Sequence, residues 1–252
     1  MVTVYGPVRD MTAQEYGRVM EVTYLGSVHG TLAALRHMRR QRAGTIVQIG
    51  SALSYRAIPL QSAYCAAKFA TRGFTDSLRS ELIAERSPIR LAMVHLPAVN
   101  TPQFDWARNH MPLRPRPVGP VFQPEPIARA IYDAAQRAPR ELWIGRPTML
   151  AILANMVAPG LLDRVLARTA LRGQMSPEPS RSGRPGNLVS AVPGDFEAHG
   201  RFDAMAHEKT IAARPSAVRM VLGAGVAALA WLAARRLHPG RALMRPGDSS
   251  RR

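Results

Sequence analysis

The apolar residues of this chain alternate between two kinds of pattern over its first 145 positions. Residues 44–51 and 89–96 are short, nearly continuous apolar runs, typical of buried strands in a parallel sheet. Between them, apolar positions follow the spacing of a helix, with Ser62 as its expected cap. The order of strand, helix and strand predicts a right-handed βαβ unit of an α/β fold.

Further elements are predicted on both sides of this unit. Thr12 and Glu15 fit a capping box, followed by a helix that continues to a stop at Gly44. Residues 126–137 predict a helix, residues 141–145 a last strand, and residues 149–171 one or two helices. From about residue 172 the composition shifts to Pro, Ser, Gly and Arg, and the periodicity fades. We therefore expect a domain over residues 1–171, a disordered linker over 172–217, and an apolar helix with a basic tail over 218–252.

Candidate chemistry begins with one lysine. Of the 34 basic residues only two are Lys, and one of them, Lys68, follows Tyr64 by four positions. Residues four apart share a helix face, so a phenol and an ammonium can face one ligand. A neighbouring positive charge is expected to lower the pKa of the Tyr64 phenol and make it a usable acid or base. A Tyr and a Lys at this spacing are weak evidence alone, since a half-buried aromatic beside a surface charge looks the same.

The residues around Tyr64 and Lys68 strengthen the case that these two side chains form a functional pair. Ser51 ends the first strand, and Pro97 and Thr101 follow the second. Ligands of open α/β sheets bind at the carboxyl ends of the strands, so Ser51 is expected to lie where a ligand binds.

These segments resemble the classical short-chain dehydrogenase/reductases. The resemblance rests on Ile-Gly-Ser at 49–51, on Tyr-Cys-Ala-Ala-Lys at 64–68, and on Leu-Pro-Ala-Val-Asn-Thr at 96–101, and it extends over roughly residues 1–145. It implies a doubly wound parallel sheet of the Rossmann type. It also implies an oxidoreductase that uses NAD or NADP to transfer hydride to or from a small-molecule carbonyl or alcohol.

The resemblance also implies residue roles. Tyr64 would move the proton of the substrate oxygen, Ser51 would position that oxygen, and Lys68 would hold the nicotinamide ribose together with Tyr64. The segment containing Pro97, Val99 and Thr101 would contact the cofactor.

The chain departs from the family at three places. Thr23 stands where the family has a catalytic asparagine, and we keep it as a catalytic candidate. Leu96-Pro97 replaces a Pro-Gly pair. The Gly-rich turn that binds the cofactor pyrophosphate has no counterpart before Met1. We therefore expect a partial sheet that lacks its first βα units, as in an N-terminally truncated member, with an exposed inner edge that favours homo-oligomers.

Other segments leave alternatives open. Residues 100–122 hold five prolines with Phe104, Trp106 and His110, which fits either an apolar substrate lid or an ordinary Pro-rich loop. His199, Asp203 and His207 fit solvated loop residues better than metal ligands, and we expect no metal. Cys65 is most simply a small packing residue.

The net charge of +17 and the pI near 11.5 would suit nucleic-acid or acidic-membrane binding. The arginines are scattered, however, and no nucleic-acid motif is present, so we expect no nucleic-acid partner. Residues 220–234 form an apolar run flanked by Arg, too short for a membrane span, which fits either a helix packed on the body or contact with an anionic bilayer through residues 218–236. The first 30 residues lack the apolar core of a signal peptide, which predicts a cytoplasmic chain with potential membrane contact.

Two functions follow from the sequence. The first is an NAD(P)-dependent oxidoreductase with Tyr64 as acid and base. The alternative is an inactive truncated chain that associates with membranes or other chains through its basic apolar tail.

Overall fold

A computed structural model describes residues 1–180, 186–218, 220, 223–225, 227–228 and 231. The chain divides into two compact units, residues 1–214 and 215–252. The first unit contains, in chain order, β1 (Val4–Tyr5), η1 (Val8–Asp10), α1 (Ala13–Val19), η2 (Met20–Leu25), α2 (Gly26–Gln41), β2 (Thr45–Ser51), η3 (Ala52–Ser54), α3 (Ser62–Ala84), β3 (Arg90–Leu96), β4 (Ala98–Val99), α4 (Gln103–Trp106), β5 (Arg108–Asn109), β6 (Leu113–Pro115), β7 (Val121–Phe122), α5 (Pro124–Arg137), β8 (Glu141–Ile144), α6 (Arg146–Val157), α7 (Pro159–Gly173), β9 (Met175–Pro179), η4 (Asp203–Met205) and β10 (Ala212–Ala213).

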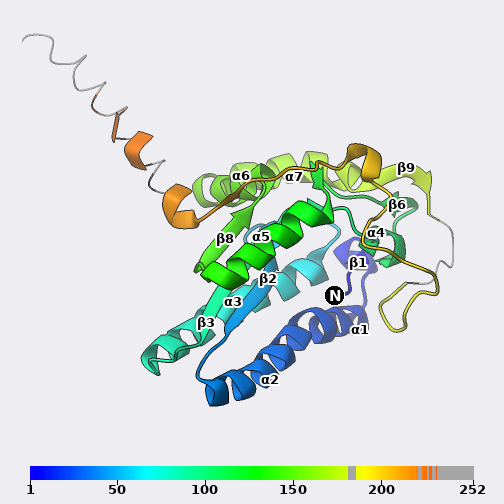
Figure 1. The fold of residues 1–252 in the computed structure, drawn as a ribbon. Coiled ribbons are helices and arrows are strands. Elements are labelled where there is room, and N and C mark those ends of the chain that lie inside the picture. The colour runs from blue at the N-terminus through cyan, green and yellow to red at the C-terminus, as the bar shows by residue number, and fades with distance from the viewer. Residues whose placement is uncertain (181–185, 219, 221–222, 226, 229–230, 232–252) are drawn as a thin grey trace, which may run out of the picture. The chain divides into compact units, whose positions relative to one another are not determined.

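The central sheet has the strand order β10-β8-β3-β2 (Figure 1). Strands β2, β3 and β8 are parallel, and β10 is antiparallel to β8. Ser51 pairs with Leu96 at the carboxyl ends of β2 and β3. The α/β architecture and the parallel βαβ unit predicted from the sequence are confirmed.

Helices cover both faces of this sheet because successive strand residues point to opposite sides. Ile46 and Leu91 pack with α2 and α3 through residues such as Leu35 and Leu78. Their neighbours on the opposite face, Val47 and Val94 among them, pack with α5. The sheet is therefore buried between α2 and α3 on one side and α5 on the other.

Strand β2 lies at one end of the strand order in the central sheet. Within the described part of the chain, no strand pairs with β2 on the side away from β3. The short strand β1 pairs instead with β5, parallel to it. Among the described residues, β2 is therefore an edge strand of the central sheet.

The helix predicted from Thr12 to Gly44 is present as three consecutive helical segments, α1, η2 and α2. Its capping box is present, because Thr12 Oγ1 accepts from the Glu15 backbone and Glu15 accepts from the Thr12 backbone. Residues 20–25 are π-helical, between α1 and α2. Ser62 differs from its expected role as a cap: it is the first residue of α3, and its hydroxyl is 2.6 Å from the Tyr16 hydroxyl.

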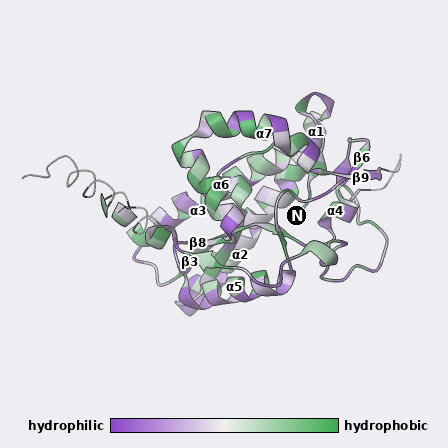
Figure 2. Ribbon diagram, turned by 90° about the horizontal axis from the view of Figure 1, so that it is seen from above, coloured by the Kyte–Doolittle hydropathy of each residue, from purple (hydrophilic) through white to green (hydrophobic). Residues whose placement is uncertain are grey.

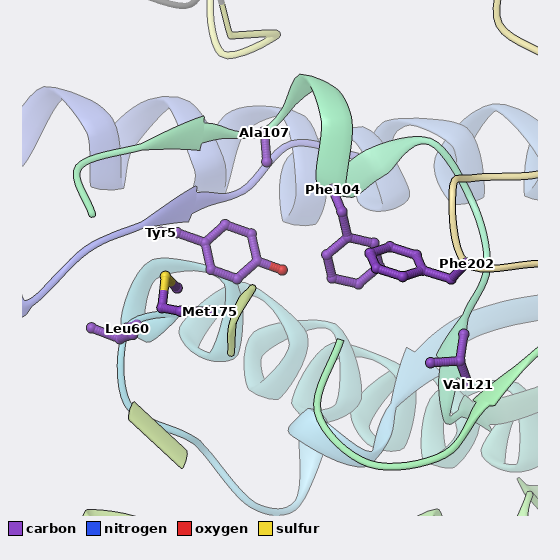
Figure 3. Close-up of a cluster of buried hydrophobic side chains, with 7 residues drawn as sticks. All are labelled: Tyr5, Leu60, Phe104, Ala107, Val121, Met175 and Phe202. Carbon is purple, nitrogen blue, oxygen red and sulfur yellow. The ribbon is translucent and has the colours of Figure 1, made fainter. Parts of the chain in front are cut away.

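A small aromatic cluster packs beside the sheet (Figure 3). The Phe104 ring lies edge-on to Phe202 at 5.4 Å and tilted to Tyr5 at 6.4 Å between ring centroids. The cluster joins residues from the beginning, middle and end of the first unit: Tyr5, Leu60, Phe104, Ala107, Val121, Met175 and Phe202.

The structure differs from the expected linker over residues 172–217. Gln174, Leu188 and Phe202 are buried in the first unit, and β10 extends the central sheet beside β8. His207 joins β7 through backbone bonds from its N–H to Val121 O and from Gln123 N–H to its carbonyl, at 2.8 and 3.0 Å. Amino-acid composition did not predict these contacts, because they come from a few apolar and backbone groups spread along a Pro- and Gly-rich segment.

The second unit holds helical residues 215–218, 220, 223–225, 227–228 and 231. Most of the apolar run at 220–234 and the basic tail fall outside the described residues. None of the helices that the structure describes is long and apolar enough to cross a membrane.

Candidate active site

A cavity of about 190 Å³ lies at the carboxyl ends of β2 and β3. It brings together residues that are far apart in the sequence, from Tyr5 to Ala151. Its walls are mostly apolar, with a few hydroxyl and amide groups. The lining residues are Tyr5, Ser51, Ala52, Leu53, Ile58, Gln61, Tyr64, Leu96, Pro97, Ala98, Gln103, Phe104, Pro117, Val118, Pro147, Thr148 and Ala151.

Ser51 is placed by the end of β2 and by the turn η3. Its Oγ accepts a hydrogen bond from Leu53 N at 3.1 Å, and its own N–H donates to Ser54 Oγ at 3.1 Å. This reciprocal capping fixes the side chain at the strand end. Because a serine hydroxyl also carries one O–H donor, Ser51 can still donate to another oxygen in the cavity.

Tyr64 and Lys68 lie one turn apart on α3, as predicted. Both are buried, and the Lys68 ammonium lies 5.6 Å from the centroid of the Tyr64 ring. Lys68 Nζ donates to Ile49 O on β2 at 2.8 Å. The Tyr64 phenol is hydrogen-bonded to Ser51.

The expected lowering of the Tyr64 pKa is not found. Burial raises the pKa of the Tyr64 phenol, the neighbouring Cys65 adds to that effect, and the hydrogen bond with Ser51 opposes it. Burial also lowers the pKa of Lys68 to about 8. Both groups lose solvent on burial, which penalises their charged forms, and this effect cannot be predicted from the spacing of Tyr64 and Lys68 along the helix.

The structure separates the other predicted site residues. Pro97 lines the cavity with Ser51 and Tyr64, whereas Val99, Thr101 and Lys68 are not among the residues that line it. Lys68 lies behind Tyr64, held to β2 through the carbonyl of Ile49.

Thr23 is engaged elsewhere. Its hydroxyl accepts from Val2 N at 3.1 Å and donates to Val2 O at 2.9 Å, and its carbonyl accepts from Ser27 Oγ at 3.2 Å. It is buried in the π-helical segment η2, away from the cavity lining. Its contacts anchor the backbone at Val2, immediately before β1.

The aromatic residues of the Pro-rich segment divide between different contacts. Phe104, Pro117 and Val118 line the cavity. Trp106 packs edge-on against Phe196 at 4.9 Å between ring centroids, and His110 Nε2 lies 2.8 Å from Glu15 Oε1. One aromatic of the three therefore faces the candidate site.

Thr148 and Gln61 are cavity residues that the sequence analysis missed. Thr148 is fully buried, and its Oγ1 has no hydrogen-bond partner among the described residues. Gln61 Nε2 donates to the buried Gln174 Oε1 at 2.7 Å. Thr148 follows the carboxyl end of β8 after Gly145, a turn residue with φ of 83°, and this position after a parallel strand was a usable signal.

A second polar cluster lies behind Ser51. The fully buried His95 on β3 places Nδ1 3.1 Å from Ser51 O and Nε2 3.8 Å from Glu141 Oε2. The same Glu141 oxygen accepts from Tyr55 Oη at 2.5 Å and from Trp143 Nε1 at 3.2 Å. Gly50 is required here, because a Cβ at that position would lie 2.8 Å from His95 Nδ1.

The exposed His199 links the segment that contains Asp203 to helix α5. His199 Nδ1 lies 2.8 Å from Asp203 Oδ1, and its Nε2 lies 2.7 Å from Glu125 Oε1. Asn100 Nδ2 also donates to Asp203, at 2.8 Å. Glu125 first, and then Asp203, raises the pKa of His199. Within the described residues, no three His, Cys, Asp or Glu side chains form a group that could hold a metal.

The chain is similar in sequence to known short-chain dehydrogenases. Residues 2–111 match the short chain dehydrogenase family model. The uncharacterized oxidoreductase YxnA of Bacillus subtilis is 29% identical over 238 residues, which cover 93% of this chain and 67% of the relative. Dehydrogenase/reductase SDR family member 7B of Bos taurus is 28% identical over 183 residues, which cover 69% of this chain and 55% of that relative.

The fold is also shared with solved structures. A short chain dehydrogenase from Burkholderia cenocepacia, solved in complex with NADP, superposes with a TM-score of 0.55 and 21% identity, and the match covers 67% of this chain and 66% of that one. The matched region of the chain, residues 2–111, belongs to the short-chain dehydrogenase/reductase family. It spans about two thirds of the length of the first of these curated relatives and just over half of the second.

Proposed function

We propose that this chain carries the substrate and nicotinamide half of an NAD(P)-dependent oxidoreductase that interconverts a carbonyl and an alcohol. The observation that supports this most is the arrangement of Ser51, Tyr64 and Lys68. Two hydroxyl groups face one mostly apolar cavity, and a buried ammonium lies over the ring of the phenol, 5.6 Å from its centroid.

The residues fit a nicotinamide cofactor by their unused hydrogen-bonding capacity. An ammonium has three N–H donors, and the structure assigns one of those of Lys68, to Ile49 O. Thr148 adds a buried hydroxyl without a partner among the described residues. A buried polar group without a partner is costly, so both residues suit the hydroxyl and amide groups of a bound ligand. Lys68 would hold the ribose, with the Pro97–Thr101 segment beside it.

Carbonyl reduction requires Tyr64 in its protonated form, and the reverse reaction would use the same phenol as its base. At neutral pH the phenol keeps its proton and can act as a general acid. When bound, the cofactor supplies a hydride to the carbonyl carbon. Tyr64 then donates its proton to the substrate oxygen, and Ser51 would orient that oxygen by turning its single O–H from Tyr64 towards it. The product is an alcohol, and the phenolate regains its proton from solvent.

Thr23 has a positioning role in this proposal, since its hydroxyl holds Val2 rather than facing the cavity. The alternative, an inactive chain that acts through its tail, has no support from the relatives, which are oxidoreductases. The choice between NAD and NADP stays open.

Titration of NADPH and NADH into the purified chain, followed by cofactor fluorescence, tests the proposal. We expect saturable binding of at least one cofactor, weakened by at least about tenfold in Lys68→Met, because the ammonium provides charged hydrogen bonds to the ribose. Lys209→Met, at the other lysine of the chain, is the matched control and should bind like the unmodified protein. Failure of both cofactors to bind would contradict the proposal.

A further inference from the structure

The two helices after β8 present an unusual surface. Residues of α6 and α7 with large, strongly exposed apolar side chains are Leu150, Met156, Val157, Leu161, Val165 and Leu171, with exposed fractions between 44% and 83%. Single exposed apolar residues are ordinary, but a succession of them along two neighbouring helices marks an interaction surface.

Helical spacing arranges these residues as stripes. Leu150 and Val157 lie seven positions apart on α6, and Leu161 and Val165 lie four apart on α7, so each pair shares one side of its helix. The stripe of α7 continues through Arg168 and Arg172, which are also exposed. Figure 2 shows hydrophobic stretches on both helices, interrupted by hydrophilic residues on α7.

The charged residues of this surface are predominantly positive. Its exposed charged residues are Arg146, Arg164, Arg168 and Arg172, with a single acid, Asp163. Asp163 is already paired with Arg56. An apolar face flanked by unopposed arginines matches the interface of an anionic bilayer, where apolar side chains enter the headgroup boundary and arginines meet lipid phosphates. A second copy of the same surface would instead bring like charges together.

Helix α6 also forms part of the cavity wall. Pro147, Thr148 and Ala151 line the cavity with Ser51 and Tyr64, while Leu150 and Val157 of the same helix face solvent. A molecule dissolved in a bilayer beneath α6 would therefore lie one helix away from the candidate site.

We propose that the exposed face of α6 and α7 docks this protein on the surface of an anionic lipid bilayer. The docked orientation supplies the cavity with an apolar carbonyl or alcohol from the lipid phase, and this second step rests on the proposed function. The docking surface is distinct from residues 218–236, the segment for which the sequence suggested membrane contact.

Vesicle flotation of the full chain tests the docking. Vesicles of phosphatidylcholine with phosphatidylglycerol should carry the protein, and pure phosphatidylcholine should carry much less. Leu161→Asn with Val165→Asn should weaken binding at least about tenfold, because two apolar side chains no longer enter the interface. Arg164→Gln and Arg168→Gln should each weaken it about fivefold, the equivalent of about 1 kcal/mol per charge near the membrane surface.

Matched control variants test whether vesicle binding depends on this surface or on any exposed apolar side chain or positive charge. Ile83→Asn on α3 removes an apolar side chain that is 71% exposed, and Arg36→Gln with Arg40→Gln removes two charges from α2. Neither should change flotation. Equal loss of binding in these controls would overturn the proposal. It would also be overturned if Met220→Asn abolished vesicle binding while the α6 and α7 variants did not change it.

The two proposals fail separately. Flotation does not depend on turnover, and cofactor titration in solution does not depend on lipid. Absence of vesicle binding by a chain that binds NADPH would reject the docking surface alone.

Discussion

Tyr55 and Tyr64 are both buried, and burial raises the pKa of both phenols, but their surroundings differ. Tyr55 donates to Glu141 at 2.5 Å, and the Arg72 guanidinium covers its ring at 3.7 Å from the centroid. Tyr64 faces the cavity, with Ser51 as its hydrogen-bonding neighbour. A buried polar group that is fully partnered holds the fold together, whereas one that opens on a cavity retains capacity for a ligand.

The largest expected effect tests this contrast directly. Tyr64→Phe should lower carbonyl turnover by about 10²- to 10⁴-fold, the range for removing a general acid, while the fold is kept. Tyr55→Phe makes the same atomic change outside the cavity lining and should retain turnover within a few-fold. Steady-state rates with an aldehyde or ketone panel measure both variants. Similar losses in the two would contradict the assignment of Tyr64.

We expect a substitution at Glu141 to lower the stability of the folded protein. Glu141→Leu leaves the Tyr55 hydroxyl and the Trp143 indole N–H buried without their shared acceptor. We expect a loss of about 2–4 kcal/mol in the free energy of unfolding, because each unsatisfied donor costs about 1–3 kcal/mol.

Urea denaturation measures this loss. Glu85→Leu is the control, since Glu85 is half exposed and pairs with Arg39 at the surface, where ion pairs contribute about 0–1 kcal/mol. If the two substitutions cost the same, Glu141 does not organise a buried network.

The smallest expected effect concerns an exposed cluster. His199 lies between Glu125 and Asp203, whose carboxylates raise the pKa of its imidazole, and His199 in turn lowers the pKa of both carboxylates. A raised imidazole pKa stabilises the folded segment below the ordinary His pKa, and that contribution is lost as the pH rises through the folded value. The carboxylates lose their contribution at the acid end, as the pH falls through their lowered pKa.

Hydrogen exchange at the amides of Gly200 and Phe202 measures this effect. Both amides donate to Asn100, one to its carbonyl and one to its side chain. Protection, corrected for intrinsic exchange, should be greater at pH 6 than at pH 8, and His199→Gln should remove the difference. A difference that survives in His199→Gln would contradict the role of the histidine.

Much of the fold could be predicted because the signals are local. The apolar runs at 44–51 and 89–96 became β2 and β3, and Thr12 with Glu15 formed the expected capping box. Ser51, Tyr64 and Pro97 lie around one cavity at the carboxyl ends of β2 and β3, the end of the sheet where the sequence placed Ser51.

The rest depended on long-range contacts. Thr148 and Gln61 joined the cavity through the packing of α6 and through Gln174, more than a hundred residues from Gln61. The Pro-rich segment after Gln174 packs on the first unit through single side chains such as Phe202, which carry no periodic pattern.

By itself, the sequence determined which groups can do chemistry here: a phenol and an ammonium on one helix face, and a serine at the end of a strand. Only the tertiary structure decided their protonation and access, because desolvation depends on everything packed around a group rather than on its neighbours in the chain. It raised the pKa of Tyr64 where the sequence suggested a decrease, kept Lys68 out of the cavity lining, and left several apolar side chains of α6 and α7 exposed.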